Sequence, residues 1–169
     1  DIMPSLVGSE MCIRDRGSRE ILIAMTHHIQ RTLEYAARDE EGTQSPVETL
    51  ALGTGSCRDF ALLMMEAARR LGYASRFVSG YLYDPALDQD AESGITVVGS
   101  GSTHAWVQVF LPGPGWVAFD PTNALFGGTH LIRVATARDP SQASPVSGTW
   151  MGEPEDFMGM EVDVQVTRR

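Results

Sequence analysis

The hydrophobic period of this chain changes once, at Gly72, and that change constrains the fold more than any other feature of the sequence. Before Gly72 the apolar residues recur at steps of three and four, which is typical of amphipathic helices. After Gly72 they alternate with polar residues, which is typical of strands with one buried face. Because the helical segments come first, the pattern predicts an α+β fold in which N-terminal helices pack on a mainly antiparallel sheet.

The individual elements follow from these two periods and from the residues that flank them. Helices are predicted over residues 18–38, 46–52 and 56–71. Strands are predicted over residues 75–83, 103–111, 116–120, 131–137 and 161–167. Ser45 and Glu48 form a capping box at the start of the second helix. The Pro-Gly-Pro-Gly segment that ends at Gly115 is a tight connection, so the second and third strands should form a hairpin.

Residues 1–16 differ from the rest of the chain, because they follow neither period and contain no cap that leads into a helix at Ser18. Their sequence resembles the adaptor read-through peptide found at the ends of open reading frames in metagenomic assemblies. We therefore interpret residues 1–16 as a non-native or disordered leader. The alternative is an ordinary mobile N-terminus. Residues 17–169 are then predicted to form one domain of ordinary size.

The charge and the cysteine content disfavour several classes of protein. Thirteen arginines and no lysine stand against 22 acidic residues, giving a net charge of −9, which argues against a nucleic-acid partner. No apolar run approaches the roughly 20 residues that cross a membrane, and no signal peptide is evident. Two cysteines are too few for a disulfide framework. We therefore expect a cytoplasmic protein without a membrane partner.

Cys57 occupies a position that favours a reactive thiol. It lies in the first turn of the third predicted helix, whose capping box consists of Ser56 and Asp59. The free N–H groups and the dipole of a helix N-terminus favour the thiolate, and a nearby imidazolium favours it further. The alternative is a buried cysteine that acts as a small apolar residue. The glycines at 53 and 55 weaken that alternative, since they let other groups approach the backbone closely.

His104 and Asp120 are the candidates for a base and for the carboxylate that orients it. If the hairpin pairs Leu111 with Gly115, both candidates fall on one face of the sheet, about 7 to 8 Å apart at the backbone. A shift of the strand pairing by one residue would place His104 and Asp120 on opposite faces. Each also has a structural interpretation, His104 as a hydrogen-bonded core histidine and Asp120 as a turn former before Pro121.

Several blocks of the chain together resemble the core domain of the bacterial transglutaminase-like superfamily. The blocks are Gly-Ser-Cys-Arg-Asp-Phe-Ala at 55–61, Arg-Phe-Val-Ser-Gly-Tyr at 76–81, His-Ala-Trp-Val-Gln-Val at 104–109, Gly-Trp-Val-Ala-Phe-Asp-Pro-Thr-Asn at 115–123 and His-Leu-Ile-Arg-Val-Ala at 130–135. The resemblance covers about residues 19–167 and implies a papain-like fold. It also implies a catalytic triad of Cys57, His104 and Asp120, with no cofactor and no metal.

The chain departs from this family pattern in two respects. Many relatives carry an N-terminal β-rich domain that is missing here, which would make the chain a fragment. The second donor of an oxyanion hole is also not evident: the backbone N–H of Cys57 is one donor, but no aromatic residue or glutamine lies just before it.

The resemblance predicts thiol-dependent acyl transfer from an amide of a peptide or protein substrate. The acceptor is water in a peptidase or amidase and an amine in a transglutaminase, and the sequence does not choose between them. A second hypothesis is a catalytically silent interaction module that keeps the fold. An arylamine N-acetyltransferase is disfavoured because its motifs differ, and a zinc site is disfavoured because Cys57 and His104 lack further ligands. The acidic loop over residues 84–101 is expected to border the site and to favour neutral or cationic substrates.

Overall fold

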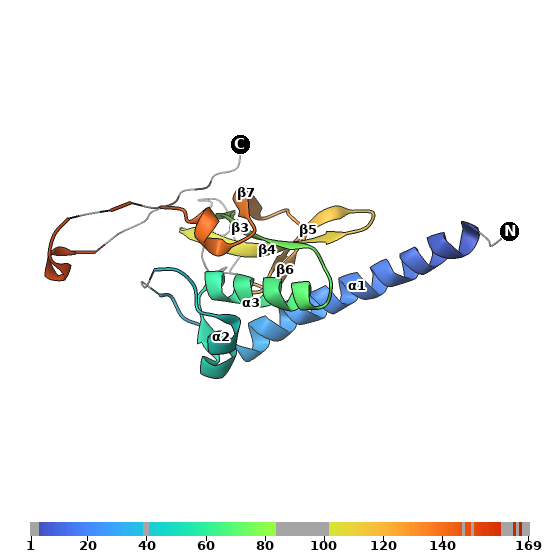
Figure 1. The fold of residues 1–169 in the computed structure, drawn as a ribbon, viewed down its shortest axis with the longest axis horizontal. Helices are drawn as coiled ribbons and strands as arrows, with labels where there is room; N and C mark the ends of the chain where they lie inside the picture. Colours follow the sequence, from blue (N-terminus) through green and yellow to red (C-terminus); the bar gives the residue numbers. More distant parts are fainter. Residues whose placement is uncertain are drawn as a thin grey trace, which may run out of the picture.

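Helices cover one face of a five-stranded antiparallel sheet (Figure 1), which confirms the predicted α+β class. The computed structural model describes residues 4–38, 41–83, 102–146, 148–149, 151–159, 164 and 166, and for residues 4–16 and 154 the backbone alone. The helices are α1 (Pro4–Thr32), α2 (Pro46–Leu52) and α3 (Cys57–Arg70). The strands of the sheet are β3 (Ser75–Leu82), β4 (Thr103–Leu111), β5 (Gly115–Asp120), β6 (Leu125–Phe126) and β7 (Leu131–Ala137). Their order in the sheet is β6-β5-β4-β3-β7.

Two kinds of short element complete the described chain. A separate parallel pair consists of β1 (Glu34–Tyr35) and β2 (Thr54–Gly55). Two 3₁₀ turns follow the sheet, η2 (Pro140–Ala143) and η3 (Pro154–Asp156). All of these elements are too short to produce a recognisable hydrophobic period in the sequence.

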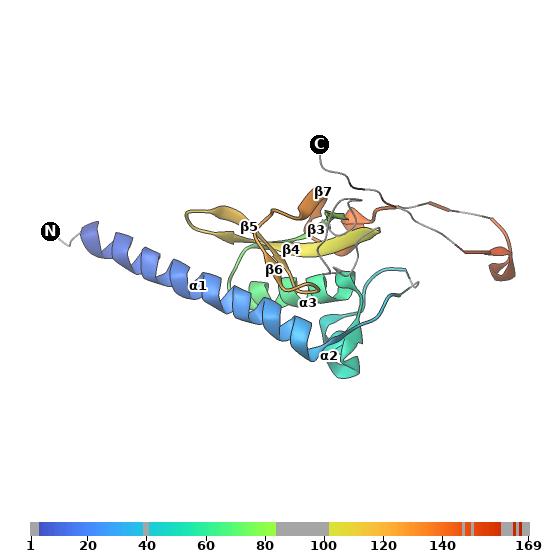
Figure 2. The same ribbon diagram turned by 180° about the vertical axis from the view of Figure 1, so that it is seen from behind.

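The core lies between α3, α1 and one face of the sheet (Figure 2). Alternate residues of β4 face this core, as the sequence predicts, and α3 supplies the opposing apolar stripe. The buried members include Leu22, Phe60, Met64, Ala68, Val107, Val109 and Phe119. A smaller buried cluster on the other face of the sheet joins Val78, Trp106 and Ala118. The residues of β4 that face the helices are therefore Ala105, Val107, Val109 and Leu111.

The hairpin between β4 and β5 has the predicted register. Leu111 pairs with Gly115, and the ladder continues without a shift to Val107 and Phe119. Gly113 and Gly115 both have positive φ values, 95° and 78°, which glycine adopts without strain. The Pro-Gly-Pro-Gly connection therefore sets the register on which the positions of the candidate site residues depend.

The structure corrects the prediction for the first helix. Helix α1 begins at Pro4 instead of residue 18, and it ends at Thr32 instead of residue 38. Figure 1 shows its N-terminal half extending beyond the sheet, where no apolar stripe is needed. Extension of an existing helix is cheap compared with its nucleation, so the missing periodicity of residues 4–17 did not prevent helix formation. The boundary at residue 16 as a domain limit stays a prediction.

Two further predictions fall mainly outside the described residues. The acidic loop over residues 84–101 lies outside them entirely. Of the strand predicted over residues 161–167, the structure describes only residues 164 and 166, neither of them in a strand. In the part of the chain that is described, no helix combines the length and apolar character needed to cross a membrane.

Candidate functional site

Cys57 is the first residue of α3, which confirms its predicted place at a helix N-terminus. Ser56 is the N-cap, and both its N–H and its hydroxyl donate to Oδ2 of Asp59, at 2.8 Å each. Cys57 carries a free thiol and is buried, with 9% of its surface exposed. Because the first N–H groups of a helix have no acceptor within it, the thiol lies beside unpaired donors and the positive end of the helix dipole.

Asp59 anchors this helix N-terminus more firmly than a capping box alone. Its side chain is fully buried, and Nη1 of Arg38 lies 2.9 Å from both carboxylate oxygens. The backbone N–H of Gln44 donates to Oδ1 at 2.7 Å. Burial opposes ionisation, but the hydrogen bonds from Ser56, Gln44 and Arg38 outweigh it and hold the pKa of Asp59 below its usual value. The charged carboxylate therefore joins three separate parts of the chain two residues from Cys57.

The segment 34–38 runs alongside the residues that precede Cys57. Two backbone hydrogen bonds of 2.9 and 3.0 Å join the strands, from the N–H groups of Glu34 and Ala36 to the carbonyls of Gly53 and Gly55. Arg38 extends the same contact to Asp59, and its own carbonyl accepts from Nη2 of Arg58 at 3.3 Å. The segment thus fixes the chain on both sides of the nucleophile candidate.

Tyr35 is the residue of this segment that lies opposite Gly55, two residues before Cys57. It pairs with Gly55 in the β1–β2 register, and 37% of its surface is exposed. Burial raises the pKa of Tyr35, the charge of Cys57 raises it further, and Arg58 partly offsets both. Tyr35 therefore lies opposite the residues that precede Cys57, with part of its side chain exposed to solvent.

His104 and Asp120 form a buried contact at the predicted place on the hairpin. Nε2 of His104 lies 2.9 Å from Oδ2 of Asp120, and neither side chain is exposed. The backbone N–H of Thr122 and the side-chain amide of Asn123 also donate to Asp120, both at 2.9 Å. Ala124 follows in the left-handed region, with φ 54°, which turns the chain back after these contacts. Asp120 is therefore fixed by its own turn as well as by His104.

The raised pKa of His104 favours its protonated form, the imidazolium. Burial alone would lower its pKa, but the hydrogen bond and charge of Asp120, together with the thiol of Cys57, raise the pKa of His104 to about 10. Since Nε2 is engaged by Asp120, Nδ1 is the atom left for the thiol. Nδ1 makes no hydrogen bond of standard geometry within the described residues, while the side chain of Cys57 lies near enough to help raise the pKa of His104.

The residues around this constellation supply packing and not further ligands. Trp106, on the same face of β4, stacks against His104 with ring centroids 6.1 Å apart and is itself buried. Within the described residues, no group of three His, Cys, Asp or Glu side chains lies close enough together to hold a metal ion. The structure thus brings His104 into contact with Asp120 and within electrostatic reach of Cys57. Their catalytic roles stay predictions.

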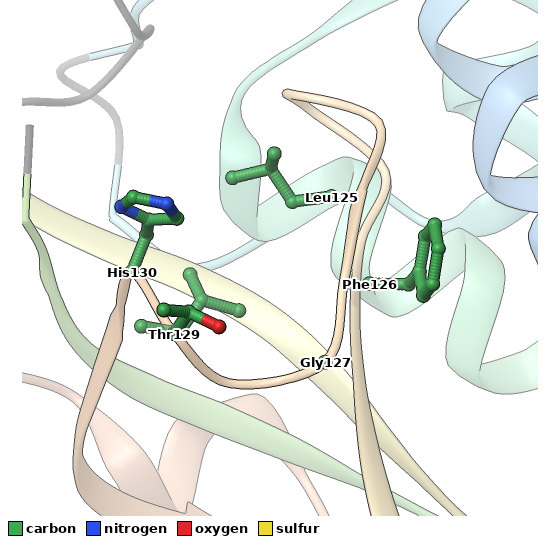
Figure 3. Close-up of a pocket in the computed structure, with 6 residues that line it drawn as sticks. Leu125, Phe126, Gly127, Thr129 and His130 are labelled. Carbon is green, nitrogen blue, oxygen red and sulfur yellow. The ribbon is translucent and has the colours of Figure 1, made fainter.

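A separate small pocket lies in the connection between β6 and β7. Leu125, Phe126, Gly127, Thr129, His130 and Leu131 line it (Figure 3). His130 stacks in parallel on Tyr83, with centroids 6.2 Å apart. Phe126 points away from His130 and toward α1, where the guanidinium of Arg19 lies 5.6 Å from its ring centre. None of the three candidate catalytic residues lines this pocket, so it is not part of the thiol site.

The chain belongs to the transglutaminase-like superfamily. The core model of that family matches residues 13–121, which is more than half of the chain and includes the three candidate catalytic residues. The uncharacterized protein ML0607 of Mycobacterium leprae is 31% identical over 150 residues, covering 89% of this chain and 50% of that protein. The uncharacterized protein YebA of Bacillus subtilis is 35% identical over 69 residues, covering 40% of this chain and 9% of that protein. The chain therefore spans half or less of the curated relatives it matches.

Solved structures with the same fold agree with this membership. A Cytophaga hutchinsonii protein for which cysteine-protease activity is proposed superposes with a TM-score of 0.58, at 23% identity, over 79% of this chain and 45% of that one. LapG of Legionella pneumophila superposes with a TM-score of 0.50, at 16% identity, over 70% of this chain and 64% of that one. At these identities the likeness establishes the papain-like transglutaminase fold.

Sequence reasoning missed Arg38 and Tyr35 as parts of this site. Both fall in a stretch predicted as the end of the first helix, and they lie 19 and 22 positions before Cys57. No local pattern signals contacts over such a separation. The one available signal is that Asp59, as a capping residue beside a cysteine, would be buried and would therefore need a cation.

Proposed function

We propose that the protein catalyses thiol-dependent acyl transfer at an amide bond of a peptide or protein, with Cys57 as nucleophile, His104 as proton carrier and Asp120 as the orienting carboxylate. One observation carries the proposal: His104 is buried, its Nε2 is engaged by Asp120 at 2.9 Å, and its Nδ1 remains without a partner in the described chain. A purely structural buried histidine is expected to have both ring nitrogens satisfied.

The chemistry follows from the positions of these groups. The thiolate of Cys57 attacks the carbonyl carbon of the amide, and the carbon–sulfur bond forms as the oxygen becomes an oxyanion. The intermediate then expels the amine, which takes the proton from Nδ1 of His104, and leaves a thioester on Cys57. Water or a second amine attacks the thioester, gives its proton back to His104 and releases the thiolate. Asp120 keeps the ring oriented throughout through Nε2.

Two donors are available for the oxyanion. The backbone N–H of Cys57 lies at the N-terminus of α3, where no acceptor within the helix competes for it. The hydroxyl of Tyr35 supplies the second donor, which is the part that sequence reasoning could not assign. The place of Tyr35 opposite Gly55, the partial exposure of its phenol and the influence of Cys57 on its pKa support this assignment. Tyr35→Phe should therefore lower kcat by about tenfold to a hundredfold while leaving thiol alkylation unchanged.

Thiol reactivity separates an active site from a silent module. The measurement uses a Cys12→Ser background, so that Cys57 is the remaining thiol. Iodoacetamide should label this protein at mildly acidic pH, where an ordinary thiol is protonated and inert. His104→Ala should abolish that labelling, and Cys57→Ser serves as the control for reaction elsewhere. Labelling that appears only at alkaline pH would favour the silent interaction module.

Product analysis separates transfer to water from transfer to an amine. The wild-type protein is incubated with a glutamine-containing peptide and a primary-amine probe, and the products are weighed by mass spectrometry. Hydrolysis of the side-chain amide indicates an amidase, an amine adduct indicates a transglutaminase, and backbone cleavage indicates a peptidase. Cys57→Ala and His104→Ala should each remove nearly all turnover, because such residues act as a unit. Asp120→Ala should do less harm than either, since Asp120 does not touch the substrate.

A further inference from the structure

The two basic residues within the strands of the large sheet converge on one neutral oxygen. Arg76 on β3 and Arg133 on β7 are the only arginines within these five strands, and the sequence contains no lysine. Nε of Arg76 donates to Oε1 of Gln108 at 3.0 Å, and Nη1 of Arg133 approaches the same oxygen at 3.5 Å. In a chain with net charge −9, two guanidinium groups therefore lie together with no carboxylate of the described residues between them.

Neither guanidinium has an acidic partner among the described residues, where the ion pairs join other side chains. Among the described residues, no acceptor pairs with the Nη groups of Arg76 or with the remaining N–H donors of Arg133. Desolvation lowers the pKa of Arg76, and repulsion from Arg133 lowers it further. The pair is thus electrostatically unfavourable as it stands, and an anionic group placed between the two side chains would relieve it.

An aromatic wall stands beside this pair. The guanidinium of Arg76 lies 4.1 Å from the ring centre of Trp116, and Phe110 meets Trp116 edge to face at 5.6 Å. Trp116 and Phe110 are 39% and 44% exposed, so a ligand can reach both the rings and the free donors. Gln108, in contrast, is 8% exposed, which makes the shared oxygen a fixed point of the site.

We propose that Arg76, Arg133 and Gln108, walled by Trp116 and Phe110, form a binding site for a carboxylate carried on a peptide. Guanidinium groups bind carboxylates through paired N–H donors, and the exposed rings offer apolar contact to the chain that carries the carboxylate. A free inorganic anion would use the arginines but not the rings.

The site is distinct from the thiol site. Gln108 follows His104 by four residues on the same face of β4, which corresponds to about 13 Å along a strand. It lies on the sheet face opposite α3, because Val107 and Val109 face the core. The proposal does not depend on the chemistry of Cys57.

Binding to dye-labelled peptides tests the site, with fluorescence anisotropy as the readout. The protein is Cys57→Ala, so that turnover cannot affect the result. Three peptides share one apolar sequence: the first has a glutamate and an amidated C-terminus, the second has glutamine in its place, and the third has glutamine with a free C-terminal carboxylate. The first or the third should bind more tightly than the second, and the preferred one identifies the source of the carboxylate.

Charge-matched variants assign the binding to these residues. Arg76→Gln and Arg133→Gln should each weaken binding of the preferred peptide by about tenfold or more, the usual effect of a lost charge-assisted hydrogen bond. Arg70→Gln removes the same charge from an exposed position on α3, on the other side of the sheet, and should change binding by less than about twofold. Melting curves confirm that all three variants fold.

Three outcomes would overturn the assignment. Equal binding of all three peptides would show that no carboxylate is recognised. Equal losses for Arg70→Gln and Arg76→Gln would show a general effect of charge. Inorganic phosphate that competes at the same concentration as the acidic peptide, at constant ionic strength, would show a simple oxyanion site without peptide recognition.

Discussion

Removing the Arg38 side-chain charge should destabilise the protein more than removing any exposed ion pair. Arg38→Met keeps the length and most of the apolar stem of the side chain but leaves the carboxylate of Asp59 buried without its cation. Loss of one partner of a buried ion pair costs about 3 to 5 kcal/mol. Asp59 keeps the N–H groups of Gln44 and Ser56 and the hydroxyl of Ser56, and Arg38 is 17% exposed. We therefore expect the lower end of that range, about 3 kcal/mol.

The matched control is the ion pair between Arg69 and Glu66. Its atoms lie only 2.6 Å apart, which is closer than those of Arg38 and Asp59, but its side chains are 28% and 37% exposed. Solvent screening makes such a pair worth about 0.5 kcal/mol or less, so Glu66→Gln should have little effect. Urea denaturation of both variants gives the comparison directly. Equal losses in the two variants would refute the argument that burial, and not distance, decides the contribution.

The ion pair between Arg38 and Asp59 also predicts how stability depends on pH. The pKa of Asp59 is held below its ordinary value of 3.8, so its stabilising contribution is present above that value and is lost as the pH falls through the lower, folded-state pKa. Removal of Arg38 raises the pKa of Asp59 toward the ordinary value. The difference in unfolding free energy between wild type and Arg38→Met should therefore shrink in acid. A difference that is constant from neutral to acidic pH would indicate that Arg38 acts through packing alone.

Further predictions concern the sheet, its buried histidine and the lysine-free composition. Because the pKa of His104 is raised from 6.5 to about 10, its contribution to stability is complete below pH 6.5 and is lost as the pH rises through about 10; the melting temperature of wild type should approach that of His104→Gln over this interval. Gly80→Ala would drive its Cβ into the carbonyl oxygen of Ile132, so chemical denaturation should show a loss of about 3 kcal/mol or failure to fold. Trp106→Phe should cost about 1 to 3 kcal/mol and Trp116→Phe less than about 1 kcal/mol, because they are 1% and 39% exposed; equal losses would contradict the assigned packing. The protein incubated alone should form no covalent ladder on a reducing denaturing gel, since it has no lysine acceptor.

Local sequence patterns predicted those parts of the structure that local interactions determine. The capping box of Ser45 and Glu48 is present, with hydrogen bonds of 2.8 and 3.3 Å, and α2 follows it as expected. Gly72 directly follows the helix predicted to end at residue 71, and its φ is 90°, a conformation that residues with a side chain rarely adopt. The bounds of β4 and β7 agree with the alternation of apolar residues. In each case the residues that cause the element lie within it or next to it.

Contacts between distant parts of the chain could not be predicted in this way. The pair β1–β2 has two residues in each strand, too few for a period, and it replaces the predicted end of the first helix. Arg38 meets Asp59 across 21 positions, and nothing near either residue specifies the other. Similarly, β6 has two residues and pairs with β5 through a turn that positions Asn123 against Asp120.

The distance between Cys57 and His104 also depends on contacts between distant parts of the chain, although local patterns identified each residue. The cap of α3 orients the thiol, and the hairpin register orients the imidazole, but the distance between them depends on how α3 packs on β4. That packing consists of side chains such as Phe60 and Met64 against Val107 and Val109. A shift of α3 by one residue along its axis would move the sulfur about 1.5 Å, half the length of a hydrogen bond, with every cap intact. The sequence can therefore identify the candidate catalytic residues and their orientation, while their contact is a property of the core.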